Sequence, residues 1–204
     1  MTDKTQFSNL QFLNIGGYQD KDKLKSSLEW SIVDINENAD IIVDIAEEIL
    51  PFNSESIDAV YCSHLLEHID LHRLTFVFSE MYRVLRKEGI IRIVVPDWDI
   101  AIRAYNENNY NFLKETRVVA DNSVYPDIPI LNLFSWAYSY HFNGKERINV
   151  HKTPFNKDVL FYFLNNIGFK NIEFKEYNKC SLIFAGLDLE QHKQCSLYCE
   201  AIKC

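Results

Sequence analysis

The sequence is poor in glycine and proline, with six Gly and five Pro among its 204 residues. This scarcity argues against a turn-rich all-β sandwich and excludes a collagen-like repeat. Long apolar runs are also missing: the longest, such as Ile90–Val95, fall far short of the ~20 residues that a membrane-spanning helix needs. Residues 1–10 lack the apolar segment of a secretory signal. We therefore expect a cytoplasmic chain without a membrane span.

Basic residues are in the minority, with 21 Lys and Arg against 29 Asp and Glu, which gives a net charge of −8. Nucleic-acid binding depends on clustered Lys and Arg, so no nucleic-acid partner is expected and a small-molecule partner is favoured. The five cysteines are odd in number and form no CxxC pair. Reduced thiols, typical of the cytoplasm, are the simpler interpretation.

Core-forming residues, by contrast, are abundant, since 47% of the chain is hydrophobic and 14% is aromatic. This is enough for a single domain over residues 1–204. Apolar runs predict seven strands, which lie at 12–15, 30–35, 41–45, 57–62, 90–95, 169–174 and 196–203.

Helical spacing of apolar residues appears between these strands at 71–87 and at 156–166. Gly89 is placed to end the first of these helices, and Gly168 is placed to end the second. The charged stretch 20–29 has room for two or three helical turns at most. Residues 100–150 are rich in aromatics and predict a small helical cap. The whole pattern predicts an α/β fold with a mainly parallel sheet covered by helices on both faces.

Several polar or glycine positions follow or end a predicted strand: Gly16, Asp34, Asp44, His64 and Asp97. Ligands of parallel sheets bind beyond the carboxyl ends of the strands. Gly16 and Gly17 would let a ligand approach the backbone, Asp34 suits a ribose diol, and Asp44 suits an exocyclic amine. Together they outline a nucleoside site. Taken singly, each aspartate is better explained as a turn residue or a helix N-cap.

Seven segments in order then resemble the class I S-adenosylmethionine-dependent methyltransferases. The resemblance is greatest to the compact type-11 group associated with bacterial surface-polysaccharide synthesis. The segments are Leu13–Gly17, Val33–Ile35, Val43–Ile45, Leu50–Phe52, Ile57–His68, Val84–Gly89 and Val94–Asp97.

This resemblance covers residues 11–99, the cofactor-binding half, and resumes weakly at 151–174 and 196–201. It implies a Rossmann-like seven-stranded sheet. Residues 100–150 would be an inserted cap and acceptor region, and residues 151–204 would form the last helix and closing strands. The implied cofactor is S-adenosylmethionine, with S-adenosylhomocysteine as product.

The resemblance also implies where the cofactor binds. Asn14, Gly16, Gly17 and Tyr18 would pass the methionine part, where Tyr18 replaces a third glycine of the family. Asp34 would hold the ribose hydroxyls, and Asp44 with Ile45 would meet the adenine. Cys62, Ser63 and His64 would line the sulfonium side.

Transfer to a hydroxyl adds the need for a base, for which a near-neutral histidine is suited. His64 and His151 rank ahead of His141 as candidates, and Asp97 is the carboxylate alternative. The expected acceptor is a sugar or sugar nucleotide, and no metal is expected.

Two alternatives of other classes stand beside this hypothesis. The altered glycine turn would suit a methyltransferase fold that binds or scaffolds without catalysis. His64-Leu65-Leu66-Glu67-His68 also matches the pattern of inverted zinc peptidases, with Glu80 or another residue as a further ligand. The same segment is, however, ordinary for the methyltransferase family at that strand end.

Overall fold

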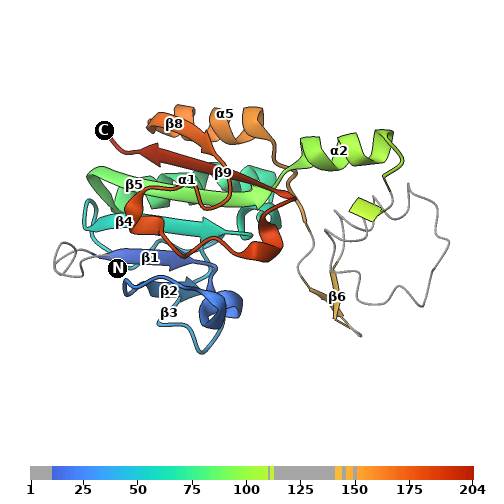
Figure 1. Ribbon diagram of the computed structural model, residues 1–204. Helices are drawn as coiled ribbons and strands as arrows, with labels where there is room; N and C mark the ends of the chain where they lie inside the picture. The colour runs from blue at the N-terminus through green and yellow to red at the C-terminus, as the bar shows by residue number, and fades with distance from the viewer. Residues whose placement is uncertain (1–10, 110, 113–140, 144–145, 149–150) are drawn as a thin grey trace.

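The computed structural model describes residues 11–109, 111–112, 141–143, 146–148 and 151–204. Its centre is a seven-stranded sheet in the order β3-β2-β1-β4-β5-β9-β8 (Figure 1). The strands are β1 (Phe12–Ile15), β2 (Ser31–Asp34), β3 (Ile41–Ile42), β4 (Ile57–Ser63), β5 (Leu85–Pro96), β8 (Lys170–Lys175) and β9 (Ser196–Ile202). β1 to β5 pair in parallel, whereas β9 runs antiparallel to both β5 and β8. The predicted seven-stranded, mainly parallel sheet is confirmed.

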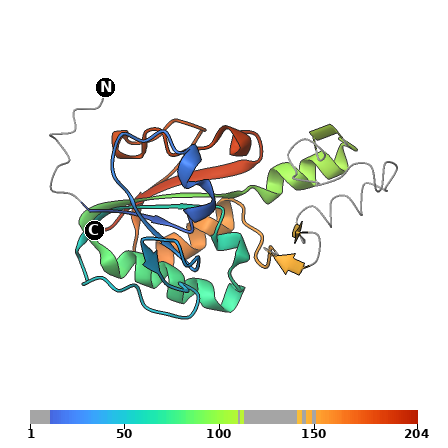
Figure 2. The ribbon, with the colours of Figure 1, turned by 90° about the horizontal axis from the view of Figure 1, so that it is seen from below.

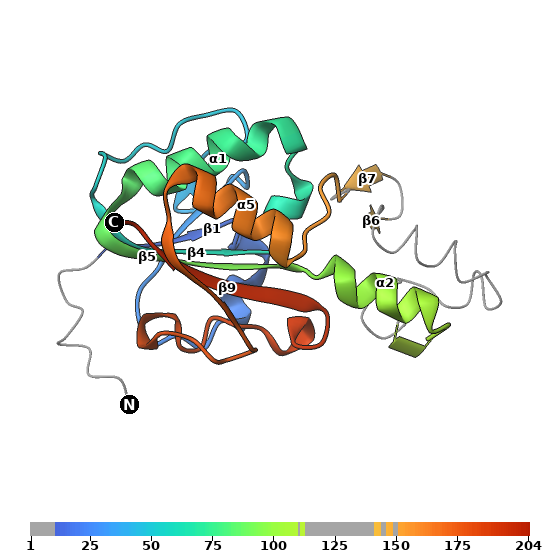
Figure 3. The same cartoon turned by 90° about the horizontal axis from the view of Figure 1, so that it is seen from above.

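Two helices cover one face of the sheet, α1 (Leu71–Val84) and α5 (Lys157–Ile167) (Figure 3). They pack on each other and on the apolar side chains of the central strands. Gly168, at φ +116°, ends α5 as predicted, because a left-handed C-terminal position favours glycine.

Gly89 does not end α1, so that prediction was wrong. The helix stops at Val84 and the chain enters β5 at Leu85. The left-handed residue is Glu88, at φ +63°. A Cβ at Gly89 would lie 2.8 Å from the Arg86 carbonyl oxygen, so glycine is needed here for a close approach of backbone.

The opposite face carries short 3₁₀ helices and loops where we expected helices. They are η2 (Tyr18–Lys23), η4 (Leu182–Phe184) and η5 (Glu190–His192), which lie across the sheet from α1 and α5 (Figure 2). Aromatic rings fill the space beneath them, with Trp30 packed 5.1 Å from Phe12 and 5.8 Å from Phe184 between ring centroids. Large rings thus provide the apolar burial that a longer helix would otherwise supply.

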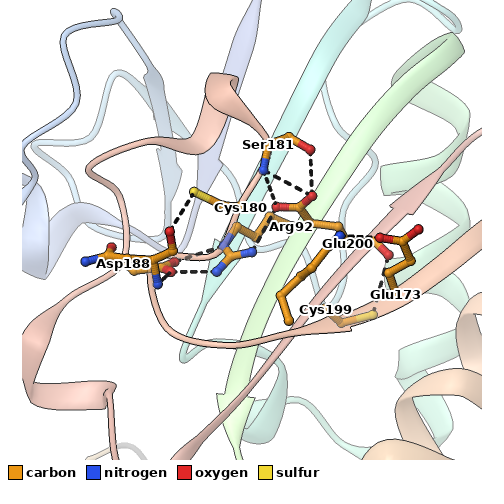
Figure 4. Close-up of polar contacts among 9 residues, drawn as sticks. Arg92, Glu173, Cys180, Ser181, Asp188, Cys199 and Glu200 are labelled. Carbon is orange, nitrogen blue, oxygen red and sulfur yellow. Dashed lines mark hydrogen bonds and ion pairs between the residues drawn. The ribbon is translucent and has the colours of Figure 1, made fainter. Parts of the chain in front are cut away.

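A buried ion cluster links the 3₁₀ helices and loops of this second face to the sheet (Figure 4). Arg92 of β5 is fully buried and donates to Asp188 through Nε at 2.9 Å and to Glu200 of β9 at 2.9 Å. Glu200 also accepts from the Ser181 hydroxyl at 2.7 Å. Arg92 therefore joins two strands of the sheet to the 181–188 segment.

A short region follows β5 at the carboxyl ends of the parallel strands. It contains the helix α2 (Trp98–Asn106) and an antiparallel pair, β6 (His141–Asn143) with β7 (Glu146–Ile148). The start of the predicted helical cap is a helix, but β6 and β7 are strands; residues 113–140 lie outside the described residues. None of the described helices has the length and apolar character needed to cross a bilayer.

Candidate functional site

The parallel register brings the predicted site residues to one edge of the sheet. Ile15 pairs with Val33 and Cys62, and Ser63 pairs with Val94. The residues that directly follow these pairs, among them Gly16 and His64, therefore lie at the carboxyl ends of adjacent strands, where parallel sheets bind ligands.

The glycine turn after β1 is closely packed by the chain itself. Gly16 has φ +78°, and a Cβ there would lie 2.8 Å from the Leu65 Cβ. A Cβ at Gly17 would lie 2.1 Å from the side-chain nitrogen, Nδ2, of Asn14. Asn14 is buried, and its side-chain oxygen has no hydrogen-bond partner in the described part of the chain. The glycines thus make room for Leu65 and Asn14, and Asn14 keeps an acceptor available at the turn.

Asp34 connects this turn to the end of β2. Its carboxylate accepts from the Tyr18 backbone N–H at 3.2 Å and from the Asn36 N–H at 3.1 Å. A carboxylate has about four lone-pair positions, so these two bonds fix its orientation and leave acceptor capacity. A half-buried, oriented carboxylate of this kind fits the ribose diol of a nucleoside.

Asp44 and Ile45 lie beyond a strand that is shorter than predicted, because β3 ends at Ile42. Asp44 is exposed and its carboxylate accepts from the Ala46 N–H at 3.0 Å, as in a turn. Ile45 is buried in the core. Asp44 therefore has the turn role considered for it, and its exposed carboxylate stays accessible.

Cys62 and Ser63 close β4 with different environments. Cys62 is fully buried among apolar side chains, and burial raises the pKa of its thiol. Its side chain thus has no exposed surface to offer a ligand. Ser63 is only partly buried.

His64 is held on three sides. Its backbone is left-handed, at φ +50°, which is uncommon for a residue with a side chain. Its Nδ1 lies 3.2 Å from Glu67 Oε1 and its Nε2 lies 2.9 Å from the Ser196 hydroxyl. Its ring stacks on His192 at 3.7 Å between centroids. Nδ1 therefore lies toward the carboxylate and Nε2 toward the hydroxyl.

Glu67 is the centre of this part of the site, and the sequence interpretation gave it no role in methyl transfer. Its side chain is 1% exposed. Burial alone would raise its pKa, but the charges of His64, His68 and His151 and a hydrogen bond from His64 lower the pKa to about 2. Glu67 is therefore an ionised carboxylate with three imidazoles around it. The spacing of His64, Glu67 and His68 is visible in the sequence, but the approach of His151 is not.

Main-chain hydrogen bonds bring His151 to this carboxylate. Lys152 and Thr153 donate their N–H groups to the Glu67 carbonyl at 2.7 and 3.1 Å. The Thr153 hydroxyl donates to the Ile69 carbonyl at 2.7 Å. The His151 ring lies 4.9 Å from the His68 ring between centroids.

Asp97 caps the helix that follows it. Its carboxylate accepts from the Asp99 N–H at 3.0 Å at the start of α2, and burial raises its pKa. This is the helix N-cap alternative considered for strand-end aspartates. The side chain of His141 lies outside the described residues.

The zinc-peptidase alternative requires a helix that the chain does not form. Leu66–His68 is a single 3₁₀ turn, so His64 and His68 do not share one α-helical face. Glu80, the suggested further ligand, accepts from Arg83 and from the Leu50 N–H in the core.

A surface hollow of about 390 Å³ lies elsewhere, lined by Lys23, Lys25 and residues of the 177–191 segment. It contains none of the predicted site residues, so it adds nothing to the site described above.

The comparisons with known proteins agree with this geometry. Residues 22–93 match the family model described as a methyltransferase domain. Two similar solved structures are S-adenosylmethionine-dependent methyltransferases from Archaeoglobus fulgidus and Methanosarcina mazei, each 16% identical over 98% of this chain. Those alignments cover 90% and 97% of the respective chains, with TM-scores of 0.55 and 0.57.

A third similar structure is phosphoethanolamine N-methyltransferase 2 from Haemonchus contortus, solved with S-adenosylmethionine. It is 13% identical with a TM-score of 0.51, over 96% of this chain and 49% of that one. No curated protein sequence matches the chain.

These findings confirm the predicted fold, and the match over residues 22–93 agrees with the predicted methyltransferase domain. The predicted cofactor, S-adenosylmethionine, is bound in the Haemonchus structure. The matches carry no information on the acceptor or on surface polysaccharides.

Proposed function

We propose that this chain is a cytoplasmic methyltransferase that transfers a methyl group from S-adenosylmethionine to a hydroxyl. The acceptor is a sugar or sugar-nucleotide precursor of a bacterial surface polysaccharide. One observation supports the reaction class: the glycine turn, Asp34 and Glu67 lie at one edge of the sheet, and histidines surround Glu67. The acceptor class is supported only by the resemblance of residues 11–99 to the type-11 group.

The cofactor would be held by groups that this chain already orients. Asp34 accepts hydrogen bonds from the ribose hydroxyls, and the free side-chain oxygen of Asn14 accepts one at the turn that includes Gly16, Gly17 and Tyr18. Asp44 and the backbone of the buried Ile45 would border the adenine, with Ser63 and the backbone of Cys62 toward the sulfonium. When bound, S-adenosylmethionine supplies a methyl group that its sulfonium has already activated, so the protein mainly has to position the acceptor.

His64 is the base of this proposal. With Nδ1–H toward the Glu67 carboxylate, Nε2 would be left to accept a proton. In the structure Nε2 lies 2.9 Å from a hydroxyl, that of Ser196. An acceptor hydroxyl that replaces Ser196 at Nε2 would give up its proton there as the methyl group is transferred. His151 lies near the same carboxylate, and Asp97 is less suited because it caps α2.

Titration calorimetry with S-adenosylhomocysteine tests the cofactor site. We expect wild type to bind and Asp34→Asn to bind about 10- to 100-fold more weakly, because charged hydrogen bonds are worth ~1.5–3 kcal/mol. Asp22→Asn, an exposed aspartate of η2, is the matched control and should bind as wild type does. Absence of binding by folded wild type would favour the non-catalytic scaffold.

Methyl transfer from labelled S-adenosylmethionine to sugar nucleotides tests the base. His64→Gln should keep S-adenosylhomocysteine affinity and lose about 10²- to 10⁴-fold in rate, the usual contribution of a general base. His72→Gln, an exposed histidine at the start of α1, is the control. Wild-type rates in both His64→Gln and His151→Gln would show that neither residue is the base.

A further inference from the structure

We propose that Glu67, His68 and His151 form a binding site for a divalent transition-metal cation of the zinc type. One ligand atom of each, a carboxylate oxygen and two imidazole nitrogens, lies within 4.8 Å of the others. This departs from the sequence-based expectation of no metal. It also differs from the peptidase pattern, because His64 is outside the set and the third ligand comes from residue 151.

The donor set selects the class of cation. Two imidazole nitrogens and one carboxylate oxygen suit Zn²⁺ and its first-row neighbours, whereas Mg²⁺ and Ca²⁺ prefer oxygen donors throughout. Bonds of about 2.0–2.2 Å in a tetrahedral site put the ligand atoms about 3.3 Å apart. A contraction of up to about 1.5 Å would thus close the set, within reach of side-chain rotation. Three protein ligands leave a fourth position open.

The two chain segments that carry the proposed ligands are held together by contacts within the protein. Glu67 and His68 belong to the 3₁₀ turn η3 (Leu66–His68), which directly follows β4. The segment after His151 is joined to this turn by the hydrogen bonds of Lys152 and Thr153 to the Glu67 carbonyl. A salt bridge from Lys152 to Asp70, at 2.9 Å, adds a further link. The ligands therefore come together through backbone contacts that do not need the cation.

The surroundings of the Glu67 carboxylate also suit a cation. Its carboxylate is 1% exposed, and in the described part of the chain only histidines lie at ion-pair distance from it. Buried carboxylates are otherwise paired with a charged group or bound to a metal. A divalent cation between Glu67, His68 and His151 would be such a partner. His64 lies outside the set, although its Nδ1 is 3.2 Å from Oε1, the oxygen that His68 Nε2 approaches to 3.9 Å.

Binding of the cation does not depend on the proposed methyl transfer, but its use in that reaction does. At the open fourth position it would bind a water molecule or another oxygen of the acceptor. His151 would then be a ligand and His64 the base.

The experiment uses the tag-free, chelator-treated and dialysed chain, titrated with Zn²⁺ and with Co²⁺. We expect one cation per chain and a Co²⁺ spectrum of tetrahedral nitrogen and oxygen ligation, without the charge-transfer band of thiolate ligands. His68→Gln and His151→Gln should each weaken binding by at least about 100-fold, beyond the loss from changing a supporting group. His72→Gln should bind as wild type does, and Mg²⁺ should not compete.

Three results would overturn the proposal: no stoichiometric binding by wild type, equal affinity in His68→Gln and His151→Gln, or a thiolate signature from the free cysteines. S-Adenosylhomocysteine affinity measured on the same samples separates the two proposals. Retained nucleoside binding with no metal binding rejects the metal site alone, and metal binding without nucleoside binding rejects the cofactor site alone.

Discussion

At the scale of single residues, the site consists of side chains that the chain itself orients. Asp34 is fixed by two backbone N–H groups, and His64 is fixed by Glu67, Ser196 and the ring of His192. Each contact removes rotational freedom before any ligand arrives, which lowers the entropy that binding must overcome. His192 has this supporting role although it lies far from His64 in the sequence.

The stability of the protein should fall in acid through His192. Burial lowers the pKa of His192 to about 3, with the nearby charge of His64 acting in the same direction; Lys23 also lowers it and Glu67 opposes them. Between about pH 6.5 and 3 the unfolded chain therefore binds a proton that the folded chain does not. His192 thus destabilises the fold by up to ~1.4 kcal/mol for each pH unit below about 6.5, and this cost is absent above that pH.

Urea unfolding between pH 7 and pH 4 measures this effect. His192→Gln should flatten the decline in the free energy of unfolding over that range, whereas His72→Gln should leave it unchanged. An identical decline in wild type and His192→Gln would show that the protonation of His192 is not linked to folding.

At the scale of elements, local sequence determined the helix that begins at Lys157 more fully than the helix that begins at Leu71. The side chain of Asn156 accepts from the Val159 N–H at 3.0 Å, and Gly168 takes the left-handed position at the other end. Both ends of α5 therefore carry a local signal. The end of α1 carries no local sequence signal, because its last turn is followed directly by strand pairing of Leu85 with Ile57.

Asn156→Ala should lower the free energy of unfolding by ~1 kcal/mol, the usual cost of losing an N-cap acceptor. Asn166→Ala, an exposed position in the last turn of α5, is the matched control and should change stability by no more than ~0.5 kcal/mol. Chemical denaturation of the two variants gives the comparison. Equal effects would mean that the cap bond contributes nothing.

At the scale of the whole molecule, the two faces of the sheet are held by different means. Helices α1 and α5 bury a continuous apolar surface, whereas the 3₁₀ cover depends on aromatic rings and on the Arg92 ion cluster. The cluster joins positions 92, 188 and 200, which have no relation in the sequence. It also positions the segment that continues to His192, beside the proposed base.

Arg92→Met should destabilise the protein by about 3–5 kcal/mol, because it leaves two buried carboxylates without their partner. Lys193→Met removes one half of an exposed pair with Glu190 and should cost less than ~1 kcal/mol. Urea unfolding at neutral pH compares them. A loss below ~1 kcal/mol in Arg92→Met would show that the buried cluster does not hold the cover in place.

The sequence by itself determined the existence and order of the strands, the two long helices, the mainly parallel sheet and the edge at which the predicted site residues meet. These depend on apolar periodicity, glycine placement and the rule that parallel strands end at one edge, all of which are local or follow from chain order. It could also predict that Asp34 and His64 lie at the same edge of the sheet.

Only the tertiary structure decided what surrounds these residues. Glu67 becomes an ionised, buried carboxylate because His151, from a distant segment, joins His64 and His68 beside it. Leu65 and Asn14 fill the space beside the glycine turn. Burial, pairing of charges and contacts between distant segments depend on how the whole chain packs, and no short window of sequence contains that information.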